Sequence, residues 1–300
     1  AGKTELVIVP NDVLAFLPFE AFITTDGKYL VEKYDIRYLP SYSIGVALQQ
    51  RAYPADRKPI LAFGNAIYNA QSVTLNDRGF KSDGTQANLE QQNFNNLMKG
   101  IPESIKKGEN MSKYYQALGY AWDNLPGTLA EVDALKVLKP EAVVIKGKEV
   151  SKNSVKQLSK TGQLKNYKIV HFATHGVVIP EFQELSALVL SQGIPGDDGY
   201  LRASEVSALD LRADFVNLSA CETGLGKIYG GEGVVGLSQS FLLSGANSVA
   251  VSLWQVSDAS TMEFQKELYR LIFVENMPPM KAIAAVKRAF IQRDDYKQPF

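Results

Sequence analysis

The chain has 300 residues, and its 32 lysines and arginines balance 32 aspartates and glutamates, so the formal net charge is zero. Hydrophobic residues make up 45% and charged residues 21%, an ordinary globular composition that excludes disordered, collagen-like and coiled-coil chains. The balanced charge gives no basic surface for direct contact with nucleic acid, and no apolar run reaches the roughly 20 residues that span a membrane. Because the sequence begins Ala-Gly-Lys rather than with methionine, we expect it to be a piece of a longer chain.

Short apolar, β-branched runs that predict strands recur along the chain. They cover residues 6–9, 36–39, 60–63, 142–145, 168–173, 187–190, 215–218 and 248–253. Several of these runs are apolar at nearly every position, which is typical of strands buried on both faces. Amphipathic segments lie between the runs, and this alternation predicts an α/β fold with a mostly parallel sheet flanked by helices.

Three helix starts are predicted from local patterns. Residues 128–131 (TLAE) and 260–263 (STME) each have the pattern of an N-terminal capping box. Pro278 and Pro279 would begin a last helix. The apolar residues expected to face inward from that helix are Ile283, Val286 and Phe290.

One segment departs from the alternation. Residues 66–110 are rich in Asn, Gln, Gly and Lys, and we interpret them as an inserted loop or a loosely packed helical excursion on the surface. The expected organisation is an N-terminal portion at 1–65, a polar insertion or mobile loop at 66–113, and a larger portion at 114–300. About 65 residues form only a marginal core, so the first portion is expected to pack on the main sheet.

The scarce residues are one cysteine, Cys221, and two histidines, His171 and His175. A single cysteine forms no intramolecular disulfide, and with two histidines it cannot build a thiolate-rich zinc site. This usage indicates a reducing compartment, most simply the cytoplasm. It leaves open whether Cys221 is a small core residue or a nucleophile.

The positions of His175 and Cys221 favour the nucleophile. Each residue follows a predicted strand, and the helix and strand between them would form a crossover that brings the two strand ends together. An imidazole beside a thiol helps to form the reactive thiolate. Gly176 would let the chain turn sharply, so that its N–H and that of Cys221 could face a developing oxyanion.

His171 lies within the predicted strand, where a structural hydrogen bond is expected. The His171–His175 spacing is also found in metal sites, but those need a helix with a glutamate between the histidines, so no metal is expected. Residues 231–236 (GEGVVG) fit the GxGxxG pattern of nucleotide sites, but a glycine-rich loop precedes them instead of a strand. They predict a flexible wall of a cleft, and a nucleotide-dependent enzyme is an alternative.

Four motifs resemble the CHAT family, whose name stands for caspase-HetF-associated-with-TPR. They are HFATHG (171–176), LSACETG (218–224), GGEG (230–233) and SLWQVSD (252–258). The segments LPFEAF (17–22), LPS (39–41) and FGN (63–65) are similar to upstream parts of that family. The resemblance is specific because the motifs occur in the right order and spacing, and it covers most of the chain apart from about 66–125.

The resemblance implies a caspase/separase-like fold and the activity of a bacterial cysteine endopeptidase that needs no cofactor. On the matching motifs, His175 would be the catalytic histidine and Cys221 the nucleophile of an acyl-enzyme mechanism. CHAT domains commonly follow TPR repeats or pair with a TPR partner, so a TPR module or TPR protein is an expected partner beside the protein or peptide substrate. The alternative from another class is a non-catalytic CHAT-like scaffold that binds a partner peptide in the same cleft.

Substrate preference would depend on residues beside the cleft. Trp254 and Asp258 are expected there, and Asp258 could pair with a basic side chain just before the scissile bond, as in separase-like relatives. The alternative for Asp258 is a cap of the helix that starts near residue 260. Glu222 is a further acidic candidate for substrate binding. Three more are Asp197, Asp198 and Glu232, and the alternative for all four is that they are solvated loop charges.

Overall fold

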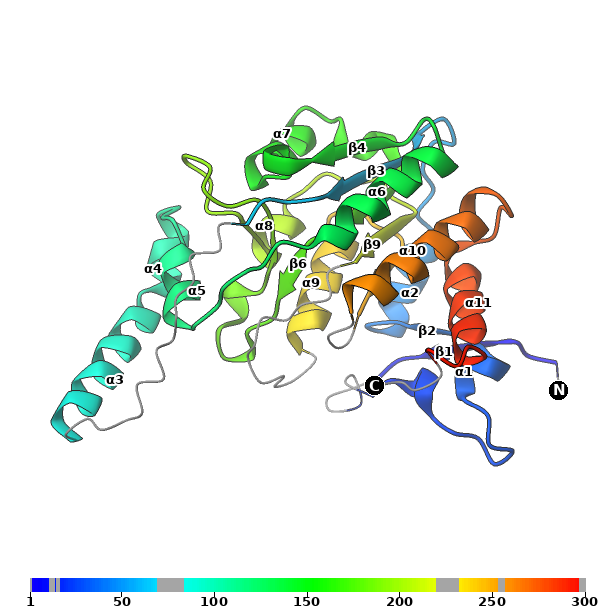
Figure 1. Cartoon of the computed structure of the whole chain (residues 1–300), viewed down its shortest axis with the longest axis horizontal. Coiled ribbons are helices and arrows are strands. Elements are labelled where there is room, and N and C mark those ends of the chain that lie inside the picture. Colours follow the sequence, from blue (N-terminus) through cyan, green and yellow to red (C-terminus); the bar gives the residue numbers. More distant parts are fainter. Residues whose placement is uncertain are drawn as a thin grey trace.

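The central parallel sheet is built from five mainly apolar strands (Figure 1). These are β3 (Lys58–Gly64), β4 (Val143–Lys146), β5 (Tyr167–Phe172), β9 (Phe215–Leu218) and β10 (Val249–Val251), in the order β10-β9-β5-β3-β4. They belong to a computed structural model that describes residues 2–10, 14, 17–68, 84–219, 232–252 and 257–296. All the neighbouring pairs are parallel, which confirms the predicted α/β fold.

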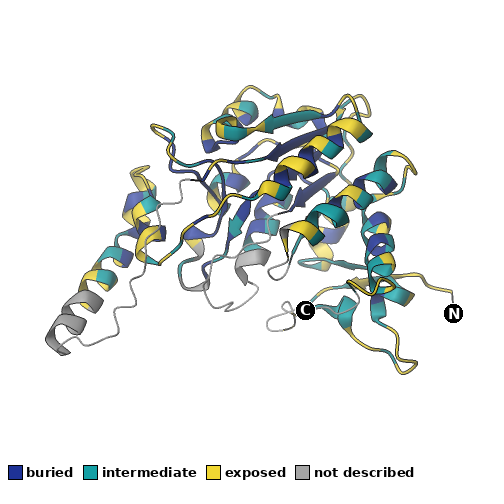
Figure 2. Cartoon of the chain, in the orientation of Figure 1, coloured by how far each residue is buried: buried dark blue, intermediate teal, exposed yellow. Residues whose placement is uncertain are grey.

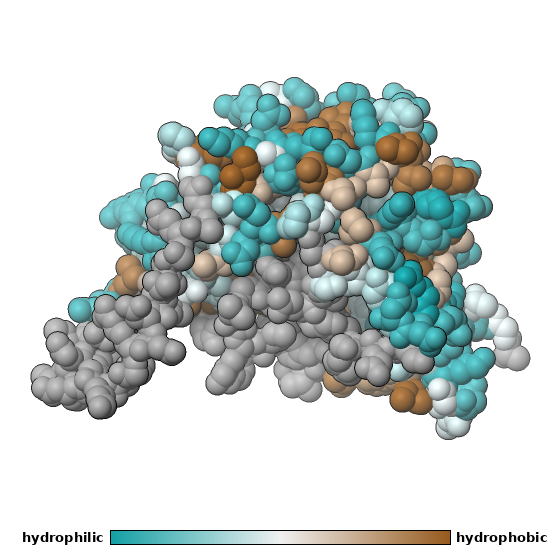
Figure 3. All heavy atoms as spheres, viewed as in Figure 1, coloured by the Kyte–Doolittle hydropathy of each residue, from teal (hydrophilic) through white to brown (hydrophobic). Residues whose placement is uncertain are grey.

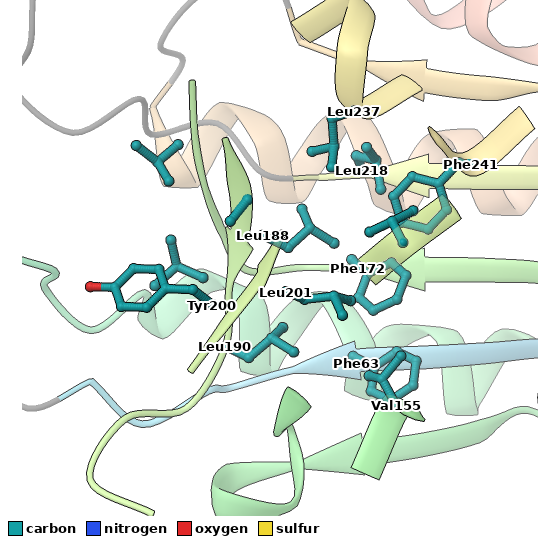
Figure 4. Close-up of a cluster of buried hydrophobic side chains, with 14 of the residues drawn as sticks. Phe63, Val155, Phe172, Leu188, Leu190, Tyr200, Leu201, Leu218, Leu237 and Phe241 are labelled. Atoms are coloured by element: carbon teal, nitrogen blue, oxygen red, sulfur yellow. The ribbon is translucent and has the colours of Figure 1, made fainter. Parts of the chain in front are cut away.

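Helices cover both faces of this sheet because successive strand residues point to opposite sides. Ile60 and Ala62 of β3 face α6 (Pro126–Leu138) and α10 (Asp258–Phe273). Leu61 and Phe63 face the opposite side, which is covered by α7 (Lys152–Lys160), α8 (Ala203–Ser207) and α9 (Glu232–Leu243). Figure 4 shows part of this second cluster, where the stacked rings of Phe63 and Phe172 lie near Val155. Burial is concentrated in the strands, as Figure 2 shows.

A second, antiparallel sheet lies at the carboxyl ends of the central strands. It consists of β6 (His175–Val177), β7 (Ala187–Val189) and β8 (Tyr200–Arg202), in that order. Only β7 was expected from the sequence, because it lies in the continuous apolar run 187–190, whereas the three residues of β6 (HGV) and of β8 (YLR) form no such run.

The N-terminal part of the chain forms a two-stranded parallel sheet. Its strands are β1 (Glu5–Ile8) and β2 (Asp35–Tyr38); α1 (Leu30–Lys33) lies between them in the chain, and α2 (Tyr42–Gln49) follows β2. The last helix, α11 (Pro279–Ile291), packs on β2 and α1. Arg288 of this helix pairs with Asp35 at 2.6 Å, and Lys287 pairs with Glu20 at 3.0 Å. These ion pairs join the N-terminal region to the last helix.

Part of the segment interpreted as a polar insertion belongs to the main core. It contains α3 (Gly84–Lys99), α4 (Ile101–Lys106) and α5 (Ser112–Ala117), and α3 projects away from the body of the molecule (Figure 1). The buried apolar residues of 66–113 join the largest apolar cluster, as do the next two residues, Tyr114 and Tyr115: the members within 66–113 are Ala66, Tyr68, Met98, Ile101 and Met111. These buried positions are widely spaced among polar residues, so they form no regular apolar pattern in the sequence.

The two predicted capping boxes are wrong, whereas the start of the last helix at the prolines is confirmed. Helix α6 begins at Pro126, and the Thr128 hydroxyl accepts a hydrogen bond from the Asn65 N–H at the end of β3. Helix α10 begins three residues earlier than expected because the Ser257 hydroxyl caps it, accepting from the N–H of Ser260 at 3.1 Å.

Hydrophilic residues prevail on the face drawn in Figure 3, and the described apolar residues there form small separate groups. Among the helices that the structure describes, none combines the length and the apolar character needed to cross a membrane.

Candidate active site

The strands that lead to His175 and Cys221 are neighbours. Strands β5 and β9 pair in parallel, with Phe172 opposite Leu218. His175 and Cys221 each stand three residues beyond this pair, so both chains leave the sheet at the same edge. This confirms that the crossover places the two strand ends side by side. Cys221 itself lies outside the described residues.

The His175 ring is buried and its orientation is set by a backbone carbonyl. Its Nε2 lies 2.6 Å from the carbonyl oxygen of Asp123. A carbonyl oxygen only accepts hydrogen bonds, so Nε2 carries a proton, and in the neutral ring the lone pair is on Nδ1. The arrangement therefore selects the tautomer that has Nδ1 as its base.

Two aromatic residues flank the same ring. The centroid of Tyr68 lies 4.7 Å from that of His175 with the planes at 62°, and the centroid of Trp122 lies 5.3 Å away at 41°. Trp122 is in turn held by its Nε1–H, which donates to the Tyr200 hydroxyl at 2.9 Å. Contacts on several sides leave the imidazole little freedom to change rotamer.

The Tyr68 hydroxyl also joins β6 to β7. It accepts a hydrogen bond from the backbone N–H of His175 at 3.2 Å and donates to the carbonyl oxygen of Val189 at 3.1 Å. His175 and Val189 are register partners, so the hydroxyl bridges the first pair of this ladder. Tyr68 therefore influences both the ring and the main chain of His175.

Gly176 lies in β6, opposite Leu188, so the predicted sharp turn at this glycine is wrong. The chain continues as an extended strand because it pairs with β7. The Leu190 N–H donates to the Gly199 carbonyl at 2.7 Å, so at this position the peptide groups of the β7 segment face β8. Alternation along the antiparallel ladder then turns Val189 and Ala187 toward β6, and turns the peptide groups of Gly176 away from β7. The N–H of Gly176 thus points out of the three-stranded sheet.

The sequence patterns did not point to Tyr68, Trp122 or the Asp123 carbonyl. All three lie in the 66–125 stretch that the motif resemblance does not cover, and a carbonyl group has no side-chain signature. The available signal was the aromatic pair Tyr120 and Trp122, whose rings stack at 5.6 Å, in a polar stretch shortly before a helix.

His171 lies on the sheet face beneath α6 and α10, away from the aromatic residues around His175. Its Nδ1 is 2.9 Å from the Tyr269 hydroxyl, and its Nε2 is 2.8 Å from Oε1 of Glu131. The prediction of a structural hydrogen bond within the strand is confirmed. In the described part of the chain, no group of three or more potential metal ligands occurs.

Several predicted substrate-binding residues cannot be placed. Trp254, Glu222 and most of the 231–236 glycine motif lie outside the described residues. Asp258 is the first residue of α10 and Glu232 the first of α9, and their side chains are also outside the description. Since Ser257 is the N-cap of α10, the alternative of Asp258 as the cap is wrong.

Asp197 and Asp198 are buried, so the interpretation of these two residues as solvated charges is wrong. The Asp197 carboxylate accepts from the N–H groups of Asn153 and Gly199, both at 2.8 Å. Asp198 pairs with Lys152 at 2.5 Å and with Arg202 at 2.9 Å. Burial by itself would raise the pKa of Asp198, but the hydrogen bond and charge of Lys152, together with Arg202, lower it below the ordinary value. These acids anchor the loop between β7 and β8 instead of facing solvent.

Comparison with known proteins is consistent with this arrangement. No curated protein matches the chain. A family model described as CHAT domain matches residues 1–300, which includes the 66–125 stretch that carries Tyr68, Trp122 and Asp123. The five-stranded parallel sheet flanked by helices is consistent with a caspase-like fold. The chain therefore belongs to the CHAT domain family, which is related to the caspase-like peptidases.

Proposed function

We propose that the protein is a cysteine endopeptidase in which His175 and Cys221 form the catalytic dyad. The observation that carries the proposal is the pairing of β5 with β9, because His175 and Cys221 follow the register pair Phe172–Leu218 by the same number of residues. The Asp123 carbonyl supports it, since a general base needs a fixed orientation and tautomer.

The reaction begins when Nδ1 of His175 takes the proton of the Cys221 thiol and the thiolate attacks the carbonyl carbon of the scissile peptide bond. The N–H groups of Gly176 and Cys221 stabilise the oxyanion that forms. The imidazolium then gives its proton to the leaving amine as the C–N bond breaks, which leaves a thioester at Cys221. Water, deprotonated by His175, hydrolyses the thioester and restores the thiol. Throughout these steps the Nε2–H group of His175 remains hydrogen-bonded to the Asp123 carbonyl oxygen, and this hydrogen bond stabilises the imidazolium.

Substrate selection is assigned to the segment before α10 and the segment after β9. Trp254, Asp258 and Glu222 would contact the substrate, and the Asp258 carboxylate would favour a basic residue just before the scissile bond. A TPR module or TPR protein would regulate the enzyme. The single cysteine fits a reducing compartment such as the cytoplasm.

The test is cleavage of a peptide library by the wild-type chain, Cys221→Ala and His175→Ala. Val137→Ala controls for the effects of mutagenesis and purification, because Val137 is an exposed residue of α6. Cleavage should be retained in the control and lost in both dyad variants, and an electrophilic peptide should add its mass to Cys221. Cleavage that persists in Cys221→Ala would overturn the proposal. Peptides that bind the wild type and are recovered uncut would support the scaffold instead.

A further inference from the structure

Five polar side chains form a connected group beneath α6 and α10, within the face of the central sheet that is otherwise apolar. They are Glu131, His171, Asn217, Gln265 and Tyr269, and all are buried. His171 of β5 and Asn217 of β9 are register partners, so they stand side by side on adjacent strands. The helices supply the other members: Glu131 from α6, and Gln265 and Tyr269 from α10.

The hydrogen bonds in this group have a definite direction. The Asn217 amide nitrogen donates to Oε1 of Gln265 at 2.7 Å and to the Tyr269 hydroxyl at 3.1 Å. The hydroxyl, which has one proton, lies 2.9 Å from Nδ1 of His171. Burial holds the pKa of Tyr269 well above its ordinary value, so the hydroxyl keeps that proton. Nε2 of His171 lies 2.8 Å from Oε1 of Glu131.

The group is attached to both halves of the proposed dyad. His171 precedes His175 by four residues, and Asn217 precedes Cys221 by four residues. Through its hydroxyl, Tyr269 therefore links the two strands at equal distances from the dyad. The α6 region contacts this part of the chain at two points, because the Asp123 carbonyl, shortly before the helix, orients His175 of β6, and Glu131 within the helix faces His171 of β5.

A polar group in this position is costly unless it is fully hydrogen-bonded, and apolar residues cover the rest of the same face. Buried polar networks restrict a core to one arrangement, since a shifted strand or helix would leave members without partners. Building on the proposed function, we propose that Tyr269 is a positioning residue for the dyad: its hydroxyl joins His171 on β5 to Asn217 on β9. It acts on the relative placement of His175 and Cys221 without touching the substrate.

The experiment measures the rate at which iodoacetamide alkylates Cys221, the only thiol of the chain, as a function of pH. Tyr269→Phe removes the hydroxyl and keeps the ring. It is expected to slow alkylation at pH 7 about tenfold, because small displacements of reacting groups have large effects on rate. The midpoint of the pH profile should rise toward the value of about 8.5 found for free cysteine. His175→Ala provides the reference for complete loss of the base.

Tyr38→Phe is the matched control, because the Tyr38 hydroxyl also has two partners, the Phe19 N–H and the Glu20 carboxylate, far from the dyad in sequence. Its rate and pH profile should equal those of the wild type. Thermal melting establishes that each variant is folded. If Tyr269→Phe does not fold, Gln265→Met tests the positioning role instead, because it removes the side-chain oxygen that accepts a hydrogen bond from Asn217.

The positioning role is overturned if Cys221 is alkylated at the wild-type rate in both Tyr269→Phe and Gln265→Met. If alkylation is at the same time slow in His175→Ala, the proposed dyad is still supported. An unchanged profile in His175→Ala would refute the dyad, and the positioning role with it.

Discussion

Replacement of Tyr68 by phenylalanine removes a single oxygen atom beside His175, and the structure gives the expected size of the effect. That oxygen makes two hydrogen bonds, one from the His175 N–H at 3.2 Å and one to the Val189 carbonyl at 3.1 Å. Both partners are buried, so little water is available to replace the hydroxyl. Since a hydrogen bond contributes about 0.5–1.5 kcal/mol net, the two bonds together predict a decrease of about 1–3 kcal/mol in the free energy of unfolding.

The assay is guanidinium unfolding followed by tryptophan fluorescence, with Tyr115→Phe as the matched control. Tyr115 is also buried, but its hydroxyl makes one described hydrogen bond, to the Leu185 carbonyl at 2.6 Å, which predicts a decrease of about 1 kcal/mol. Tyr68→Phe should additionally change the alkylation rate of Cys221, because the bridge holds the strand that carries His175.

Two results would refute this reasoning. A decrease in unfolding free energy below about 0.5 kcal/mol would show that the bridge makes no net contribution. If the free energy of unfolding decreases as predicted but Cys221 is alkylated at the wild-type rate, the bridge stabilises the fold without orienting His175.

Two further predictions concern stability alone. Asp198→Asn should lower the free energy of unfolding by about 3 kcal/mol, because the buried Lys152 and Arg202 then keep only the Glu205 carboxylate as a charged partner. Since the folded pKa of Asp198 is lowered, its contribution is complete above the unfolded value of about 3.9 and is lost as pH falls through the folded pKa. Acid titration of the melting temperature should therefore be flatter in the variant, and an equal slope would contradict the assignment. Gly245→Ala should cost more than about 2 kcal/mol, because φ is +114° and the new Cβ would lie 2.0 Å from the Leu211 carbonyl oxygen. Gly196→Ala is the control, because at φ of +74° and with no atom within 4 Å of the new Cβ it introduces backbone strain without a steric clash. Equal decreases in the free energy of unfolding in the two variants would show that the clash with the Leu211 carbonyl does not contribute.

The long apolar strands were predictable because each carries its own evidence. The runs in β3, β5 and β9 are mainly apolar, which is the pattern expected of a sheet buried on both faces. The starts of α6 and α10 were misjudged because hydroxyl side chains had alternative partners. Thr128 bonds across to Asn65, a residue distant in the chain, and Ser257 competes with Ser260 for the cap.

By itself, the sequence determined that the chain alternates strands and helices, that its only thiol is Cys221, and that a His-Gly pair and this cysteine each follow a buried strand. Local composition and spacing are sufficient for these conclusions because each depends on a short stretch of residues. Only the tertiary structure decided that the Asp123 carbonyl orients His175, that the Tyr68 hydroxyl bridges β6 and β7, and that the Tyr269 hydroxyl links β5 to β9. These contacts join residues 52 to 121 positions apart, and one of them uses a backbone group that every residue possesses, so no local pattern could reveal them.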